Sequence, residues 1–333
     1  MIRKKILQKR IKKLEESKKE LLLFNKELKV ELKDIHFRCN DLMKKYNALI
    51  GEINLKYYEL LPEEKYEEEA KKRFLMKTGG ILDLKEPKSL NEKIQWMKFN
   101  ENDPKKTMLS NKLAVREWVA KNIGEDYLNE LYGDWSNFDE IDIDKLPKRF
   151  VLKANHGSEM AIVVDDKNKM DIESIRRKVN KWMVTNYAYK GLEMHYKDII
   201  PRVMAEEHMG ASGKDFLDYK FWCFHGRVEF IKTLNIVNGE VIEECCYDRE
   251  WRKTPFQAYG RKIKPDFDKP ALLKEMMEVS EKLSKEFKFV RVDLYQQGKD
   301  KIKFGEMTFT PGNGEHKWVP DKYDKILGDI LIL

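Results

Sequence analysis

The chain has 333 residues, 41% hydrophobic and 37% charged, which suits two folded units with an appendage better than one small domain. Residues 1–20 hold nine Lys or Arg and three Glu, a net charge of +6, so only +1 of the total +7 remains for the other 313 residues. This excludes a strongly basic nucleic-acid groove in the body. The tip lacks interleaved aromatic residues, so it suits an anionic membrane surface or a solvated helix face.

Cysteine usage and hydropathy indicate the compartment. The four cysteines show no metal-ligand spacing and two of them are adjacent, which favours a reduced setting: Cys39, Cys223, Cys245 and Cys246. No run of 18 apolar residues occurs, and the opening "MIRKKILQKR" lacks an apolar signal core. We expect a cytoplasmic protein, soluble or peripheral at the inner face of the membrane.

A heptad repeat dominates the N-terminal region. One apolar row recurs every seven residues: Leu7, Leu14, Leu21, Leu28, Ile35, Leu42 and Leu49. A second row is mixed and includes Lys18 and Asn25, which fix register at some cost in stability. The pattern predicts a coiled coil over residues 7–49, roughly 64 Å long and a parallel dimer, within a segment 1–50. A single amphipathic helix packed on the body is the alternative. Gly51 and Pro62 bracket its end.

Residues 51–107 are predicted to be a connecting segment of helix and loop. Ser89 is the expected N-cap of "KIQWMKF", because Glu92 three residues later completes a capping box. The next stretch, "MLSNKLAVREWVAKNIGEDYL", predicts a helix ending at Gly124. Two short strands are then expected at 149–152 and 160–164.

The loop between these strands reads "KANHGS" and begins with a lysine, Lys153. A lysine at a strand end beside a small-residue turn can reach phosphate oxygens, and backbone N–H groups can approach them. Most lysines at such positions are merely solvated, so this signal alone leaves both interpretations open.

A predicted helical block, "DIESIRRKVNKWMVTNYAYKGLEMHY", precedes the strand "PRVMAEEHMG", which closes on Glu206 and Glu207. The hairpin "DYKFWCFHGRVEFIKTL" follows, turning at His225 and Gly226. The two acids could accept hydrogen bonds from ribose hydroxyls while the adjoining backbone bonds adenine, or they could be ordinary surface residues.

The segments "FVRVDLY" (289–295) and "KIKFGEMTF" (301–309) predict a second hairpin. If Tyr295 pairs with Ile302, Asp293 lies opposite Phe304 and Glu306 opposite Arg291. One face would then carry Asp293, Arg291, Phe304, Glu306 and Thr308. Two carboxylates about 7–8 Å apart on a diagonal can hold Mg²⁺ with phosphate oxygens. The alternative is two surface acids with Arg291 as their salt-bridge partner.

Together these blocks resemble the ATP-grasp proteins, and more narrowly the TupA-like ATP-grasp family of bacterial capsule, teichuronopeptide and exopolysaccharide gene clusters. The similarity covers residues 80–333 in seven ordered blocks, which are "SLNEKIQWMK", "NKLAVREWVAKNIGEDYL", "LPKRFVLKANHGS", "PRVMAEEHM", "DYKFWCFHG", "VRVDLY" and "FGEMTFTPGNG". The resemblance implies an α+β ATP-grasp fold after the coiled coil, with one subdomain at 108–205 and another, carrying the metal-binding hairpin, at 206–333.

The resemblance also implies site residues. Catalysis would use Lys153 and Arg227. The residues expected around ATP are Lys112, Lys153, His156, Ser158, Glu206, Glu207, Met209, Asp218 and Lys220. Mg²⁺ would lie on Asp293, Glu306 and Thr308, where Thr308 stands at a position usually held by Asn. Two features depart from the family. Glu159 brings negative charge towards the phosphates, and a short helical segment stands in place of an N-terminal doubly wound domain.

The main functional hypothesis is an ATP-dependent carboxylate–amine ligase acting through an acyl phosphate in surface-polymer biosynthesis. Its partners would be a nucleotide, a carboxylate and an amine, with Arg116, Arg202 and Arg227 as candidate carboxylate anchors. A glycosyltransferase is the alternative suggested by "IDIDK", because Asp142 and Asp144 could chelate the metal of a sugar nucleotide. A non-catalytic nucleotide-binding scaffold is the third hypothesis, supported by Glu159.

Overall fold

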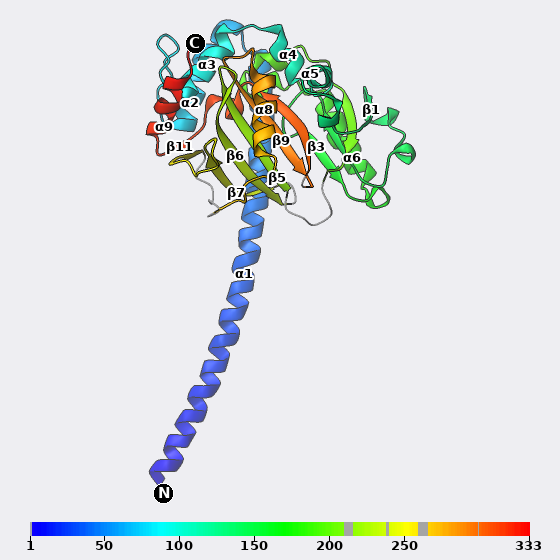
Figure 1. Ribbon diagram of the computed structural model, residues 1–333. Helices are drawn as coiled ribbons and strands as arrows, with labels where there is room; N and C mark the ends of the chain where they lie inside the picture. The colour runs from blue at the N-terminus through cyan, green and yellow to red at the C-terminus, as the bar shows by residue number, and fades with distance from the viewer. Residues whose placement is uncertain (1, 210–215, 238–239, 259–265, 299) are drawn as a thin grey trace. The chain divides into compact units, whose positions relative to one another are not determined.

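The computed structural model describes residues 2–209, 216–237, 240–258, 266–298 and 300–333 (Figure 1). The chain divides into two compact units, Met1–Glu59 and Leu60–Leu333. The first unit is helical, and the second contains the described β-strands. Across the described residues, none of the helices combines the length and the apolarity that a transmembrane span requires.

The first unit is formed by one helix, α1 (Ile2–Leu60). The helix predicted from the heptads is confirmed, and it ends between Gly51 and Pro62, as predicted. The helix continues through Gly51 and stops before Pro62, which disfavours helical backbone in the residue ahead of it. The described members of the apolar row are exposed along α1: Leu21, Leu28, Ile35, Leu42 and Leu49.

The second unit begins with short helices. They are α2 (Tyr66–Thr78), α3 (Leu90–Asn100), α4 (Pro104–Ser110) and α5 (Val115–Asn122). The capping box predicted at α3 is confirmed, because the Ser89 side chain accepts from the Glu92 backbone N–H while Glu92 accepts from that of Ser89.

The uninterrupted helix predicted to end at Gly124 is wrong, because the chain breaks between α4 and α5. Asn111 Oδ1 accepts from the backbone N–H groups of Leu113 and Ala114, which folds the break into a turn. Lys112 donates its own N–H to the carbonyl of Asn155. The break therefore fixes Lys112 beside the loop that follows Lys153.

A four-stranded antiparallel sheet forms the first subdomain of the body. Its order is β1 (Leu131–Trp135), β4 (Val203–Glu207), β2 (Phe150–Ala154) and β3 (Ala161–Val164). Helix α6 (Ile172–Met183) packs Ile175 and Val179 against Phe150 and Leu152 of the sheet. The buried face alternates with polar positions along β2, so Lys153 lies between the buried residues Leu152 and Ala154.

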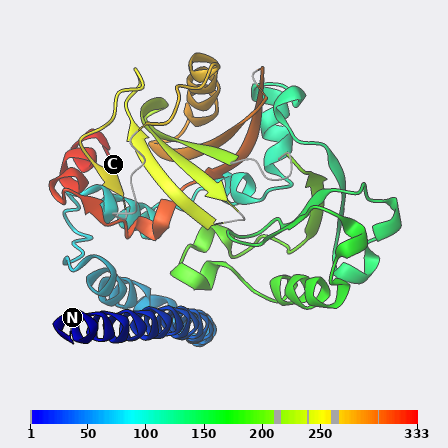
Figure 2. The ribbon, with the colours of Figure 1, turned by 90° about the horizontal axis from the view of Figure 1, so that it is seen from below.

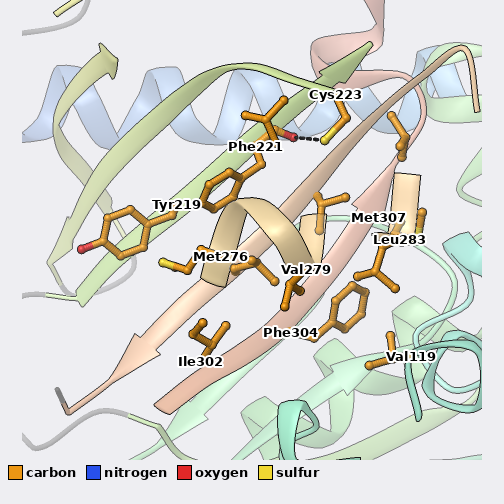
Figure 3. Close-up of a cluster of buried hydrophobic side chains, with 14 of the residues drawn as sticks. Val119, Tyr219, Phe221, Cys223, Met276, Val279, Leu283, Ile302, Phe304 and Met307 are labelled. Carbon is orange, nitrogen blue, oxygen red and sulfur yellow. Dashed lines mark hydrogen bonds between the residues drawn. The ribbon is translucent and has the colours of Figure 1, made fainter. Parts of the chain in front are cut away.

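A five-stranded antiparallel sheet forms the second subdomain. Its order is β10 (Lys301–Thr308), β9 (Phe289–Gln297), β5 (Phe216–Phe224), β6 (Arg227–Val237) and β7 (Glu240–Tyr247). Helix α8 (Leu273–Ser284) covers one face (Figures 1 and 3). Figure 3 shows Met276, Val279 and Leu283 of α8 over Phe221 of β5 and Met307 of β10.

The opposite face is covered near the β5–β6 turn. Helix α9 (Lys322–Ile330) packs beside α3, and both contact a cluster containing Trp222 and Phe224 of β5. The short pair β8 (Gln257–Ala258) and β11 (Trp318–Val319) adds Trp318 to it. Figure 2 shows the small sheet with α6 on one side of the large sheet and α9 on the other. The rest of this face includes the charged residues Lys220, Asp293 and Glu306.

The predicted register of the β9–β10 hairpin is wrong by one residue next to the turn and by two residues beyond a bulge in β10. Lys303 pairs with Tyr295 and Phe304 with Leu294, but Glu306 then pairs with Asp293. Gly305 is the inserted residue, and a Cβ there would meet the Tyr295 ring at 2.6 Å. Because Phe304 pairs with Leu294, it is buried under α8 and not beside Asp293 as predicted, and the bulge then puts Glu306 on the face of Asp293. Glu306 and Asp293 become direct neighbours rather than diagonal ones.

Candidate functional site

Charged side chains form a cluster on the face of the large sheet that α8 leaves uncovered. Lys220 of β5, Asp293 of β9 and Glu306 of β10 occupy one register row across three strands. Lys220 Nζ lies 2.5 Å from Asp293 Oδ2 and 2.6 Å from Asp218 Oδ2. Burial raises the pKa of the Asp218 carboxyl, and Lys220 opposes that shift.

Arg291 is the centre of this cluster. Its Nε donates to Asp293 Oδ1 at 2.6 Å, and its Nη2 donates to Asp293 Oδ2 at 2.7 Å and to Glu306 Oε1 at 2.9 Å. Burial by itself would lower the pKa of Arg291, but the carboxylates of Asp293 and Glu306 outweigh it and the pKa is raised. The guanidinium therefore stays charged and holds both acids in place.

The two carboxylates have the chemistry that Mg²⁺ requires. Burial would raise the pKa of Glu306, but Lys112 and Arg291 reverse the shift and bring the pKa to about 2. Asp293 is 1% exposed and directly opposite it in the sheet. Thr308 Oγ1 donates to Glu306 Oε1 at 3.0 Å and accepts from Arg291, so the hydroxyl orients Glu306 in this arrangement.

Within the described ranges, no three His, Cys, Asp or Glu side chains are grouped closely enough to hold a metal by themselves. Mg²⁺, however, is commonly bound by one or two carboxylates, with waters and substrate phosphates completing its octahedron. Asp293 and Glu306 are a donor pair of that kind by residue type. Arg291 is also their salt-bridge partner, as the alternative interpretation expected, so a bound ion would replace part of these contacts.

Lys112 connects this cluster to the loop after β2. Its Nζ donates to the carbonyl of Gly157 at 2.6 Å and lies 3.7 Å from Glu306 Oε2. Burial lowers the pKa of Lys112, and Glu306 opposes that change. A Cβ on Gly157 would meet the Tyr187 ring at 2.7 Å, so the loop can pass this close only as glycine.

Lys153 lies on the adjacent small sheet and forms a second charged group with Glu206. Lys153 Nζ is 2.7 Å from Glu206 Oε2, and Arg116 Nη1 is 3.3 Å from Glu206 Oε1. Arg116 also donates to the carbonyl of Asn129. Lys112, Arg116, Lys153 and Glu206 line one small cavity with Gly305. The structure thus brings Lys112, Lys153 and Glu206 together, with Glu206 paired to Lys153 rather than placed apart from it.

The end of β4 carries the remaining acid of the predicted hinge. Glu207 Oε1 accepts from Gln297 Nε2 of β9 at 3.3 Å, which joins the two sheets. Met209 follows β4 and is half-buried.

The loop residues expected at the phosphates divide into two groups. His156 is buried, with Nδ1 3.1 Å from Asn155 Oδ1 and Nε2 3.0 Å from the carbonyl of Trp182, and burial lowers its pKa. Its ring therefore stabilises the loop through these contacts and does not point to the charged cluster. Ser158 lines a pocket next to Glu306. Glu159 is 79% exposed and turns to Lys190 at 2.8 Å, rather than towards Lys112.

Other predicted residues lie outside the cluster. Arg227 is at the β5–β6 turn, 60% exposed and paired with Glu229, so the geometry does not support the catalytic role predicted for it. Arg202 pairs with Asp134 of β1. Asp142 pairs with Lys145 at 3.0 Å in a 3₁₀ turn.

The sequence analysis did not identify a polar pocket of about 320 Å³ next to Glu306 and Thr308. Arg73, Lys190 and Glu193 line it together with Asn313. These residues are far apart along the chain and belong to no motif, so no sequence signal could have grouped them.

The fold and the site define the class, two antiparallel α+β subdomains that bring lysines and a carboxylate pair together, as in ATP-grasp proteins. Residues 92–332 match the family model described as "TupA-like ATPgrasp", which spans well over half of the chain. The chain belongs to this TupA-like ATP-grasp family, and the predicted fold class is confirmed. No curated protein sequence matches the chain.

Solved structures show a weaker likeness. The D-alanine–D-alanine ligase of Bacillus anthracis complexed with ATP is 17% identical at a TM-score of 0.42, covering 67% of this chain and 65% of that chain. The L-amino acid ligase of Bacillus licheniformis is 16% identical at 0.41, covering 66% and 49%. The N5-carboxyaminoimidazole synthetase of Staphylococcus aureus complexed with ADP is 11% identical at 0.38, covering 62% and 46%. The chain thus spans about half to two thirds of the length of these proteins.

Proposed function

We propose that this protein is an ATP- and Mg²⁺-dependent carboxylate–amine ligase that works through an acyl phosphate. One observation carries the proposal: the register of β5, β9 and β10 places Lys220, Asp293 and Glu306 side by side, with Arg291 between the acids and Lys112 facing them. Cations converging on a carboxylate pair suit a triphosphate and its metal, because phosphoryl transfer depends on positioning and charge neutralisation.

In the first step, a carboxylate oxygen of the substrate attacks the γ-phosphorus of ATP, the bond to the bridging oxygen breaks, and ADP leaves. Lys112 and Lys153, which line one cavity, would hold phosphate oxygens. Arg291 would stabilise the transferred phosphoryl group, since its guanidinium already lies beside Glu306. Asp293 and Glu306 would hold Mg²⁺, which would supply Lewis-acid neutralisation of the phosphate charge.

In the second step, an amine nitrogen attacks the acyl carbon and phosphate leaves with the electron pair of the broken C–O bond. The amine loses its proton and an amide results. The chain has to orient the two reactants and needs no side-chain nucleophile.

We place the adenosine at the end of β4, near Glu207 and Met209. Glu206 has a different part, because its carboxylate holds Lys153 and Arg116 in position. Lys220 and Asp218 would support Asp293 from β5.

ADP release in the presence of Mg²⁺ and a panel of acids and amines tests the function. Glu306→Gln and Asp293→Asn should each slow ADP release by at least about 100-fold, because each removes charge that the transferred phosphoryl group needs. Glu278→Gln, an exposed acid on α8, is the matched control and should leave the rate unchanged. Full turnover in either site variant would refute the proposed site.

Two other outcomes would favour the competing functions. Binding of a nucleotide sugar without binding of ATP would favour the glycosyltransferase. Normal ATP binding without turnover on any acceptor would favour a scaffold.

Two further parts of the proposal concern the N-terminal unit. We propose that residues 7–49 pair with a second copy as a parallel coiled coil, since the apolar row is exposed along α1. We also propose that the basic tip, residues 1–20, meets an anionic membrane surface, which would place the ligase near surface-polymer intermediates.

A further inference from the structure

The pocket beside Glu306 is built by segments that surround the two sheets. Arg73 comes from α2, Lys190 from α7 (Ala188–Gly191), and Asn313 from the 3₁₀ turn Pro311–Gly314 after β10. Arg73 precedes the residues that match the family model, 92–332. One wall of the pocket therefore comes from a helix that precedes the matched region.

One end of the pocket holds a buried acid. Glu193 is 7% exposed and accepts a hydrogen bond from the Thr310 hydroxyl. Thr310 lies two residues after Thr308, the last residue of β10. The hydrogen bond therefore holds Glu193 close to the end of the strand that carries Glu306. Burial raises the pKa of Glu193, and Lys98 opposes the change. A buried carboxylate gains strongly from a cationic partner.

Two tyrosines form the wall beside this acid. Tyr187 and Tyr196 both line the pocket, with their rings edge to face and their centroids 4.9 Å apart. Faces of aromatic rings attract an ammonium group, which adds to the attraction of Glu193.

The mouth of the pocket carries positive charge. Arg73 donates to Glu315 Oε1 at 2.6 Å and to the carbonyl of Lys190 at 3.1 Å. Lys190 pairs at 2.8 Å with Glu159, which is 79% exposed. An exposed ion pair contributes little stability, so Lys190 can exchange Glu159 for a ligand anion at small cost.

The framework of the pocket is fixed before any ligand arrives. Lys98 Nζ donates to the carbonyl of Gly191 at 2.8 Å and to Asn313 Oδ1 at 2.7 Å. A Cβ on Gly191 would meet Asn313 Oδ1 at 2.9 Å, so α7 and the turn are packed as closely as glycine allows. A fixed site loses less entropy when it binds a small ligand.

We propose that this pocket binds the amine substrate of the ligase, and that this substrate is an amino acid, with its amino group at Glu193 and its carboxylate at Arg73 and Lys190. This rests on the ligase function proposed above and adds the acceptor class. Glu306, Thr308 and Arg291 line the same pocket, so a bound amine lies next to the site where the acyl phosphate forms. A volume of about 320 Å³ suits a small molecule.

Equilibrium binding tests the assignment without turnover. Calorimetry with the full chain would compare L-alanine, L-glutamate and L-lysine with ethylamine, which lacks a carboxylate, and propionate, which lacks an amine. At least one amino acid should bind, and both truncated probes should bind at least about tenfold more weakly, because each loses a charge-assisted hydrogen bond. Failure of all three amino acids to bind, or equal binding of the truncated probes, would overturn the proposal.

Variants locate the site. Glu193→Gln keeps the Thr310 hydrogen bond, and Lys190→Gln alters a half-exposed side chain, so both should fold and weaken amino-acid binding about 10- to 100-fold. Arg73→Lys keeps the charge near Glu315 and should lose less affinity than Arg73→Gln. Lys72→Gln, on the solvent side of the same helix, is the matched control. Unchanged affinity in Glu193→Gln and Lys190→Gln would contradict the assignment.

Trapping with hydroxylamine separates the two proposals. Hydroxylamine attacks an acyl phosphate directly and gives a hydroxamate, so it reports the first step alone. Glu193→Gln should raise the KM for the amino acid at least about tenfold, a larger change than the change in its rate of hydroxamate formation. No hydroxamate from the wild type, with amino acids still bound, would contradict the ligase function and leave the pocket assignment standing.

Discussion

Apolar side chains are exposed to solvent along the helix α1 but buried in the β-sheet body. Leu28 of α1 is 42% exposed, whereas Leu294 of β9 is fully buried. The structure of α1 follows from a short repeat, since each turn of a helix bonds only to its neighbours in sequence. The site in the body depends on strands far apart in sequence, and a shift of one residue moves every side chain to the other face. Mutations in the two regions should therefore act differently.

The largest expected effect is on the stability of the body. Arg291→Met leaves the buried carboxylate of Asp293 without its bidentate partner and should lower the free energy of unfolding by about 3–5 kcal/mol. All seven tryptophans lie in the second unit, so urea unfolding followed by their fluorescence reports on the body. Arg38→Met breaks an exposed pair with Asp34 on α1 and should change the free energy of unfolding by less than about 0.5 kcal/mol. Equal effects would contradict the comparison.

The second effect concerns self-association. Ile35→Lys places a charge in the proposed seam of the coiled coil and should weaken association by at least about 2 kcal/mol. Val30→Lys adds the same charge at an exposed position outside both heptad rows, and it should leave association intact. Sedimentation equilibrium measures both variants. A wild-type chain that is monomeric at all concentrations would rule out the coiled coil.

The third effect depends on pH. The pKa of Glu306 falls from 4.5 to about 2 on folding, so its ionised form contributes stability above pH 4.5 that is lost as the pH falls towards 2. The stability advantage of the wild type over Glu306→Gln should shrink over this window. At about 1.4 kcal/mol per pKa unit, the change has an upper limit of about 3 kcal/mol. Unfolding free energies measured from pH 2 to 7 test this, and a constant difference would contradict it.

The smallest effects come from two glycines and should have opposite signs. Gly305→Ala forces a methyl group against Tyr295 and should cost the body about 1–3 kcal/mol. Gly51→Ala meets nothing within 4 Å and should stabilise α1 by up to about 1 kcal/mol. Thermal unfolding, followed by fluorescence for the body and circular dichroism for the helix, distinguishes them. Equal signs would show that the bulge tolerates a side chain.

Much of the fold could be predicted from local patterns. The capping box of Ser89 and Glu92, the strands around "KANHGS" and both hairpins were recognised because each depends on residues close together in sequence. The same reasoning failed at Asn111, where one side chain turns the backbone. A single polar residue or glycine can interrupt a helix or be tolerated in it, depending on its surroundings.

Most residues of the candidate site could be named from the sequence, but their positions relative to one another could not. Alternation placed Asp293, Arg291 and Thr308 on one face, but the position of Glu306 depended on the bulge at Gly305. Arg227 was included in the predicted site because arginine can bind anions, but it lies at the β5–β6 turn, outside the cluster.

The sequence by itself determined the long N-terminal helix, the family and the residues of the carboxylate row, because heptads, strand alternation and ordered blocks are properties of the chain read in one dimension. Only the tertiary structure decided that Glu306 faces Asp293, that Glu206 holds Lys153, and that Arg73 and Glu193 share a pocket. These relations join residues brought together by strand pairing and packing, and such contacts form only when the whole body folds.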